Sequence, residues 1–289
     1  MTWFTFSIFS IFALAAAELT QQHLLNKKNA FSERTSAVLT FLIQSVIAMP
    51  FLFMLGISDQ LFYIFDQAIF PRVLFVTLIA SIGMVFYLKS FRVRNISISA
   101  IFVSFSVIVS TLFGIAFFSE SMSYLKFLGT SLVLVAIVVV NYKNTILEKN
   151  HFYGLVAGFI FGICYTLDKS IVTSNIHPLV YIFWAFFMVA LWGFVLGGRD
   201  VVNSIKGKKL CAYWPIIISS VGYFLFNFFT FTAYQFGGEV GRVDAINNAQ
   251  IFLIILFEFF VLKHTEGIIR KLFSAGLAIG GILILGMVK

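Results

Sequence analysis

The sequence predicts an all-α integral membrane protein of ten transmembrane helices, built as two inverted five-helix repeats. Three observations support this fold class: an apolar composition, ten apolar runs of membrane-spanning length, and a similarity between the two halves of the chain. Apolar residue types make up 60% of the 289 residues, whereas charged residues make up only 11%. Soluble domains are about 45–50% apolar and about 25% charged. The chain therefore has too few charges to cover a surface exposed to water.

The ten apolar runs give the expected positions of the membrane spans. A spanning helix needs about 20 mostly apolar residues. The expected spans are 2–25, 35–56, 71–89, 96–118, 122–142, 152–172, 177–197, 211–235, 243–262 and 268–288. No Lys or Arg precedes the first run, which we interpret as a retained helix and not as a signal peptide. The longest connections, Gly56–Pro71 and Gly197–Leu210, are too short to be domains.

The two halves resemble each other, which divides the chain into repeats at residues 1–147 and 148–289. The run Phe113–Val140 is similar to Phe257–Leu285. Five spans per repeat is an odd number, so the second repeat must cross the membrane in the opposite direction. Inverted repeats of this kind are a recurrent transporter architecture, with the solute site near mid-membrane between the halves.

The basic residues give an orientation. When the connections are numbered in order, 15 of the 20 lysines and arginines fall in odd-numbered loops. Because cytoplasmic loops carry the excess of Lys and Arg, this distribution predicts cytoplasmic odd loops and external termini. The net charge of +8 is accounted for by topology and anionic lipid headgroups, and it does not indicate nucleic-acid binding.

Two glycine patterns indicate close helix packing. Gly154, Gly158 and Gly162 recur every four residues, and Gly276 and Gly280 repeat this spacing in the last span. Small residues at this spacing let helix backbones approach each other. We expect both sets to lie at helix–helix contacts.

Glu18 is the main candidate for chemistry, because a carboxylate within lipid is costly and usually faces a wet interior. Gln21 and Gln22 follow three and four residues later, on the same helix face. One interpretation is a proton or cation coupling site; the other is an interfacial carboxylate that reaches water. We interpret Asp168 and Lys169 as interfacial charges in preference to a site.

Polar stripes on two neighbouring spans suggest a solute-facing wall. The first contains Tyr223, Asn227, Thr230 and Tyr234 at helical spacing, and the second contains Asp244, Asn247 and Asn248, with Gln250 nearby. The alternative is hydrogen bonding between helices, where Asn and Gln commonly act. The four histidines show no metal-ligand spacing, and no Walker, nucleophile-elbow or HExxH motif is present. We therefore expect no cofactor, no metal and no enzyme activity.

The segment Glu120–Gly129, ESMSYLKFLG, followed by an apolar run to Asn141, resembles the signature of the ten-helix EamA-like branch of the drug/metabolite transporter superfamily. The resemblance covers nearly the whole chain, although Gly267 replaces the signature Glu in the second half. It implies a solute carrier with cytoplasmic termini, whereas the charge distribution implies external termini, and both orientations stay open.

The first helix is also similar to that of the small multidrug resistance branch, through Ala17-Glu18 and a closing Lys27. This resemblance implies that Glu18 exchanges protons for substrate. Tyr165 occupies the corresponding position in the second half, which implies a single coupling carboxylate.

These observations together predict a secondary-active transporter that exports amino acid-like metabolites or cationic amphiphiles by proton-coupled alternating access. Glu18 is the expected coupling residue. The expected solute-binding residues are Gln21, Gln22, Tyr165, Tyr223, Asn227, Tyr234, Asn247 and Asn248.

Two other functions stay open: uptake of a nutrient such as a quaternary amine or nucleotide-like metabolite, and a membrane enzyme or non-transporting assembly factor. The expected partners are the solute, membrane lipid and a proton or other cation, without nucleic acid. We expect a monomer or homodimer in a bacterial inner membrane.

Overall fold

The computed structural model describes residues 2–25, 31–92, 99, 102–121, 123–141, 150–262 and 268–287, and within these it is helical with no strand. The α-helices are α1 (Trp3–Leu25), α2 (Glu33–Met54), α3 (Phe70–Ser90), α5 (Phe105–Phe118), α6 (Tyr124–Asn141), α7 (His151–Val172), α8 (Pro178–Ile205), α9 (Trp214–Gln235), α10 (Val240–Asn247), α11 (Gln250–Leu262) and α12 (Ile268–Met287). Short 3₁₀ helices, η1 (Ser58–Phe65) and η2 (Leu210–Ala212), lie in two connections. The predicted all-helical class is confirmed.

Six helices of the described chain are long and apolar enough to cross a membrane: Trp3–Leu25, Glu33–Met54, Phe70–Ser90, Phe152–Val172, Pro178–Ile205 and Leu210–Gln235. Shorter apolar helices occupy Phe105–Phe118, Tyr124–Val139 and Gly276–Leu285. Large apolar side chains such as Phe12, Phe53, Phe75 and Phe117 are exposed on the outer surface. A multi-pass membrane protein has this surface because lipid, and not water, surrounds it.

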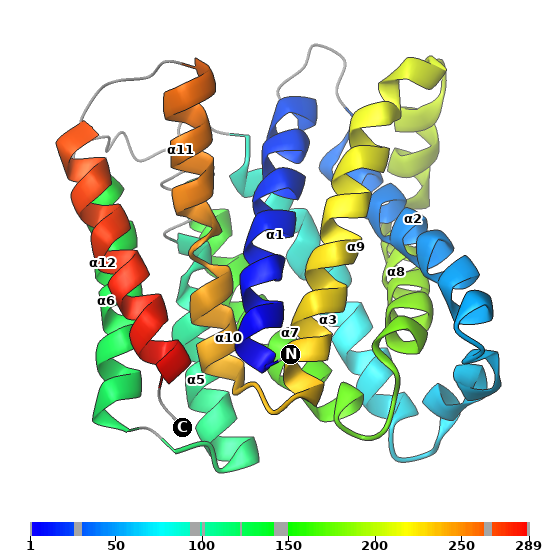
Figure 1. The fold of residues 1–289 in the computed structure, drawn as a ribbon. Helices are drawn as coiled ribbons and strands as arrows, with labels where there is room; N and C mark the ends of the chain where they lie inside the picture. The colour runs from blue at the N-terminus through cyan, green and yellow to red at the C-terminus, as the bar shows by residue number, and fades with distance from the viewer. Residues whose placement is uncertain are drawn as a thin grey trace.

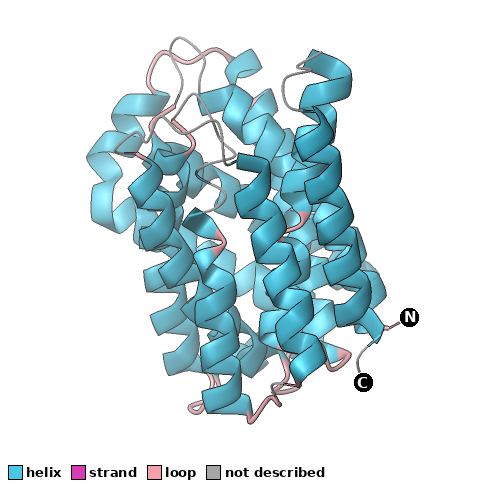
Figure 2. Cartoon of the chain, turned by 90° about the vertical axis from the view of Figure 1, so that its left-hand side faces the viewer, coloured by secondary structure: helices cyan, strands magenta, loops and turns pink. Residues whose placement is uncertain are grey.

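The helices stand side by side and run alternately up and down, so that α1 begins and α12 ends at the same end of the molecule (Figure 1). Figure 2 shows the same bundle from the side, with the helices along one long axis. The most extensive packing is between α1 and α9, α2 and α8, α6 and α12, and α3 and α7. Each of these pairs joins a helix of the first half to a helix of the second half.

Two large apolar clusters hold this bundle together, and a third, small cluster comprises Leu24, Phe31 and Ile216. The larger of the two joins α1–α3 to α7–α9, and the other joins α5 and α6 to α10–α12. Helix α1 belongs to both large clusters, through Leu14 and Ala17 on one side and Ile11 on the other. It therefore lies where the two parts of the core meet.

Two expected element bounds were wrong. Helix α8 bends at Gly197, which has non-helical backbone angles, and continues to Ile205, so most of the expected connection is helical. The expected span 243–262 is two helices, α10 and α11, which are separated at Asn248 and Ala249. The Asn248 side chain donates to the Asp244 carbonyl at 2.9 Å, a local bond that competes with regular helix.

A similar interruption occurs in the first half, just before α5. Residues 102–103 are helical, Ser104 is in a turn, and α5 begins at Phe105. The Val107 amide donates to the Ser104 carbonyl at 3.0 Å, a three-residue bond typical of a tightened turn. Discontinuous helices of this kind occur where a transporter lines its solute site.

The predicted close packing of the first glycine set is confirmed. A Cβ on Gly158 would lie 2.5 Å from the Val103 carbonyl oxygen and 3.0 Å from that of Phe102. A Cβ on Gly162 would lie 2.5 Å from the Val109 Cβ. At Gly158 and Gly162, helix α7 therefore approaches residues 102–109, at and just before the start of α5, so closely that only glycine fits.

The prediction for the second glycine set was wrong. A Cβ on Gly276 or Gly280 would meet no described atom within 4 Å. The contact between α12 and α6 is made instead by Gly281, where a Cβ would lie 2.7 Å from the Gly129 carbonyl oxygen. The spacing identified the correct helix but the wrong face of it.

This packing predicts opposite effects for two identical substitutions. Gly158→Ala should destabilise the protein by about 1–3 kcal/mol, the typical cost of overpacking, because the methyl group meets fixed backbone oxygens. Gly276→Ala should be neutral or stabilising by up to about 1 kcal/mol, because the space is open and alanine favours helix. Thermal unfolding of both variants in the same detergent measures the difference. Equal melting temperatures would contradict the packing described.

Candidate functional site: an acidic cavity between the halves

A cavity lies in the middle of the bundle, between helices of the two halves. Its lining comes from α1, α2, α3, α5 and Val103, just before α5, in the first half, and from α7–α11 in the second half. It leaves about 100 Å³ free for the centres of water-sized molecules. One water needs roughly 10–15 Å³ by this measure. The cavity can therefore hold several waters or a small solute.

Glu18 lies on the wall of this cavity and is only 4% exposed, so it faces the protein interior and not the membrane boundary. Its Oε1 accepts a hydrogen bond from the Tyr87 hydroxyl of α3. The Gln250 amide, at the start of α11, donates to Oε1 and Oε2 at 3.3 and 3.4 Å. The carboxyl group is thus held by neutral donors from both halves.

Asp244, at 1% exposure, lies on α10 one turn before the break in the helix. Its Oδ1 accepts from Ser106 at 3.2 Å and from the Asn248 amide at 2.8 Å, and its Oδ2 accepts from Ser110 at 2.9 Å. Asn248 in turn accepts from Ser104 at 2.9 Å. The two interrupted helix segments therefore contact each other through polar side chains.

Two further amides connect the halves. Asn247 accepts from Ser10 of α1 and donates to Thr230 of α9 at 3.2 Å. Asn227 donates to Gln44 of α2 at 3.2 Å and to the Tyr223 carbonyl within its own helix at 2.7 Å. These side chains bond between helices, as one interpretation of the polar stripes predicts, and they also line the cavity.

Asp168 was misinterpreted as an interfacial charge. It lines the cavity and accepts from the Tyr181 hydroxyl at 2.5 Å, whereas the adjacent Lys169 pairs with Glu120 at 2.6 Å. Neighbouring residues project about 100° apart on a helix, so the two side chains serve different surfaces. Asp168 follows Tyr165 by three residues, and this shared face was the signal that could have identified it.

The expected solute-binding residues divide into two groups. Five of them line the cavity together with Glu18: Tyr165, Tyr223, Asn227, Asn247 and Asn248. Gln21, Gln22 and Tyr234 are not among the residues that line this cavity. Gln21 accepts from Ser219 at 2.9 Å and so joins α1 to α9, while Tyr234 is buried near the end of α9.

The charges of the lining are one-sided. Glu18, Asp168 and Asp244 all contribute to the wall, and the lining includes no Lys, Arg or His. None of the ion pairs among the described residues involves these three acids. In the part of the chain that the structure covers, no group of three His, Cys, Asp or Glu could hold a metal ion. The described cavity wall therefore carries three acidic side chains and no basic one.

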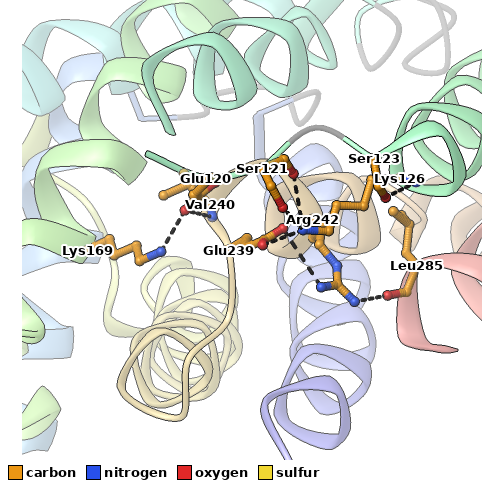
Figure 3. Close-up of polar contacts among 9 residues, drawn as sticks. All are labelled: Glu120, Ser121, Ser123, Lys126, Lys169, Glu239, Val240, Arg242 and Leu285. Atoms are coloured by element: carbon orange, nitrogen blue, oxygen red, sulfur yellow. Dashed lines mark hydrogen bonds and ion pairs between the residues drawn. The ribbon is translucent and has the colours of Figure 1, made fainter. Parts of the chain in front are cut away.

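A group of ion pairs lies outside the cavity, at the end of the molecule where α1 begins (Figure 3). Glu120 pairs with Lys169 at 2.6 Å and accepts from the Val240 amide at 3.0 Å. Lys126 pairs with Glu239 at 2.5 Å. Each pair joins a residue of the first half to one of the second half.

Arg242 extends this group toward α1 and α12. It lies 3.8 Å from Glu239, donates to the Leu285 carbonyl, and stacks over the Trp3 ring at 4.4 Å from the centroid. Five ionised side chains, Glu120, Lys126, Lys169, Glu239 and Arg242, thus connect the halves at this end. We call them the end cluster.

Comparison with known proteins shows a similarity in sequence and a similarity in fold. The family model described as the EamA-like transporter family matches residues 1–142. A protein of known crystal structure aligns with a TM-score of 0.73 over 98% of this chain and 95% of its own, at 13% identity, a likeness that shows the fold alone. No curated protein sequence matches the chain. The resemblance to the EamA-like transporter family predicted from Glu120–Gly129 is confirmed for residues 1–142, the part of the chain that the family model matches.

Proposed function

We propose that the protein is a secondary-active carrier that moves a small organic solute by alternating access, with Glu18 as the proton-coupling group. The match of residues 1–142 to the EamA-like transporter family supports a membrane transporter of small solutes. The observation that carries the finer proposal is the central cavity, where buried carboxylates lie between the halves without basic partners. Intramembrane acids of this kind mark proton relays and solute pathways.

Helix pairing supports an inverted arrangement of repeats 1–147 and 148–289. If the helices of the first half correspond in order to those of the second, α1 matches α7 and α3 matches α9. Swapping each helix for its counterpart in the other half then turns the pair α1–α9 into the pair α7–α3. The same swap turns α2–α8 into α8–α2 and α6–α12 into α12–α6, so these two pairs are unchanged. All four pairs are among the most extensive contacts. The breaks at Ser104 and at Asn248–Ala249 also fall in corresponding helices.

The end cluster supports alternating access. Lys126 and Glu120 are largely buried ions whose partners come from the opposite half. At the other end, the described ion pair between halves is Arg34–Asp200, at 3.5 Å and largely exposed. Exposed pairs are worth about 0–1 kcal/mol, whereas removing one member of a buried pair typically costs about 3–5 kcal/mol. In this proposal the end cluster holds the two halves together at this end, and rocking would break its pairs.

Replacement of Glu18 tests the coupling. In proteoliposomes with a pH gradient, we expect the native protein to accumulate L-phenylalanine or benzyltrimethylammonium, which represent the two expected solute classes. Glu18→Gln keeps the size of the side chain, and its carbonyl oxygen can still accept the bond from Tyr87, but it carries no titratable proton. It should reduce gradient-driven accumulation at least tenfold while the protein remains folded and inserted. Radiolabel uptake measures this.

Asp59→Asn is the matched control, because it neutralises an exposed carboxylate in the connection before α3 and should leave flux unchanged. Undiminished gradient-driven flux in Glu18→Gln would exclude Glu18 as the coupling group. If the native protein moved no amino acid, amine or quaternary amine, the carrier proposal itself would be wrong.

A further inference from the structure

We propose that the solute is an organic amine without a carboxylate, whose ammonium group binds Asp244 and whose apolar body lies against the aromatic wall of the cavity. This inference rests on the proposed carrier function and narrows its solute class. The two classes expected from the sequence were amino acid-like metabolites and cationic amphiphiles. The cavity chemistry distinguishes between them.

The acidic side chains of the cavity lining favour a solute without a carboxylate. An amino acid would bring its own carboxylate into a cavity that already contains Glu18, Asp168 and Asp244. A buried charge without a partner is costly, and the lining offers no basic side chain for that carboxylate. Lys126 and Lys169 are already paired in the end cluster. A solute with a positive charge alone avoids this cost.

Hydrogen-bonding capacity is the second argument. Gln250 is only 6% exposed and lines the cavity, yet its carbonyl Oε1 has no hydrogen-bond partner in the described part of the chain. The Oδ2 of Asp244 accepts one bond, from Ser110, although each carboxylate oxygen can accept about two. The cavity thus has unused acceptors, and an ammonium group supplies up to three donors and no acceptor.

The position of Asp244 makes it the anchor for the ammonium. It lies at the contact between the two interrupted helix segments, where Ser106 and Ser110 of the first half meet α10 of the second. A cation bound there would contact both halves at once. Glu18, held by Tyr87 and Gln250, remains available for the coupling proton.

Aromatic rings supply the third argument. Phe41, Phe161, Tyr165, Phe186 and Phe226 all line the same cavity as the three acids. Aromatic faces attract cations, and they also bury apolar surface. The limited free space favours a body of about one aromatic ring.

Three compounds with the same ring test the proposal on the purified full-length protein in detergent at pH 7.5. Phenethylamine carries only the ammonium, L-phenylalanine carries both charges, and 3-phenylpropionate carries only the carboxylate. Binding stabilises the folded state by mass action and therefore raises the melting temperature. Calorimetric titration measures the same binding directly. We expect phenethylamine to bind at least tenfold more tightly than either of the other two.

Asp244→Asn should weaken phenethylamine binding at least tenfold, while Asp59→Asn should bind it as the native protein does. The comparison of the three compounds on the native protein stands even if the Asp244 variant fails to fold. Binding of L-phenylalanine or 3-phenylpropionate as tight as that of phenethylamine, or no binding of phenethylamine, overturns the proposal.

The failures of the two proposals are distinguishable. Gradient-driven flux of L-phenylalanine with equally tight binding of L-phenylalanine would leave the carrier intact and remove the amine selectivity. Tight, selective binding of phenethylamine without flux of any cation would leave the recognition site intact and remove the carrier.

Discussion

The rule that governs this molecule is that a polar group placed at mid-membrane must find its partners inside the protein, because lipid offers none. Glu18 and Asp244 obey it by accepting hydrogen bonds across the boundary between the halves. The acids therefore do two things at once: they join the halves, and they require a polar cavity around them. Apolar packing could hold the bundle together without them, but it could not produce a cavity with this charge.

Lipid also explains how much of the fold could be predicted. A fixed bilayer thickness imposes a minimum length on apolar runs, so helices such as Trp3–Leu25 and Trp214–Gln235 were identified within a few residues. The bend at Gly197 and the break at Asn248 were missed, because local hydrogen bonds and neighbouring helices set such positions and the length of an apolar run does not show them.

The site was predicted less completely, for a geometric reason. Periodicity places Glu18, Tyr223 and Asn227 on helix faces, and these faces line the cavity. It does not give the depth of a residue along the bundle, so it could not tell that Gln21, unlike Glu18, bonds to Ser219 and lies outside the cavity lining. Nor does it give the rotation of one helix against another, so Asp168 was taken as interfacial although it lines the wall.

The proposed transport cycle requires that the end cluster separates the cavity from one side of the membrane, and the native cysteines allow a direct measurement of this. Cys164 lines the cavity, and the exposed Cys211 lies in η2 at the opposite end, where it reports the orientation of the protein in liposomes. The measurement is the rate at which a membrane-impermeant thiol reagent, applied at the end-cluster face, labels Cys164. We predict slow labelling in the native protein and at least tenfold faster labelling in Glu239→Gln, which breaks the pairs with Lys126 and Arg242. Rapid labelling of native Cys164 from that face, unchanged by the substitution, would contradict the account.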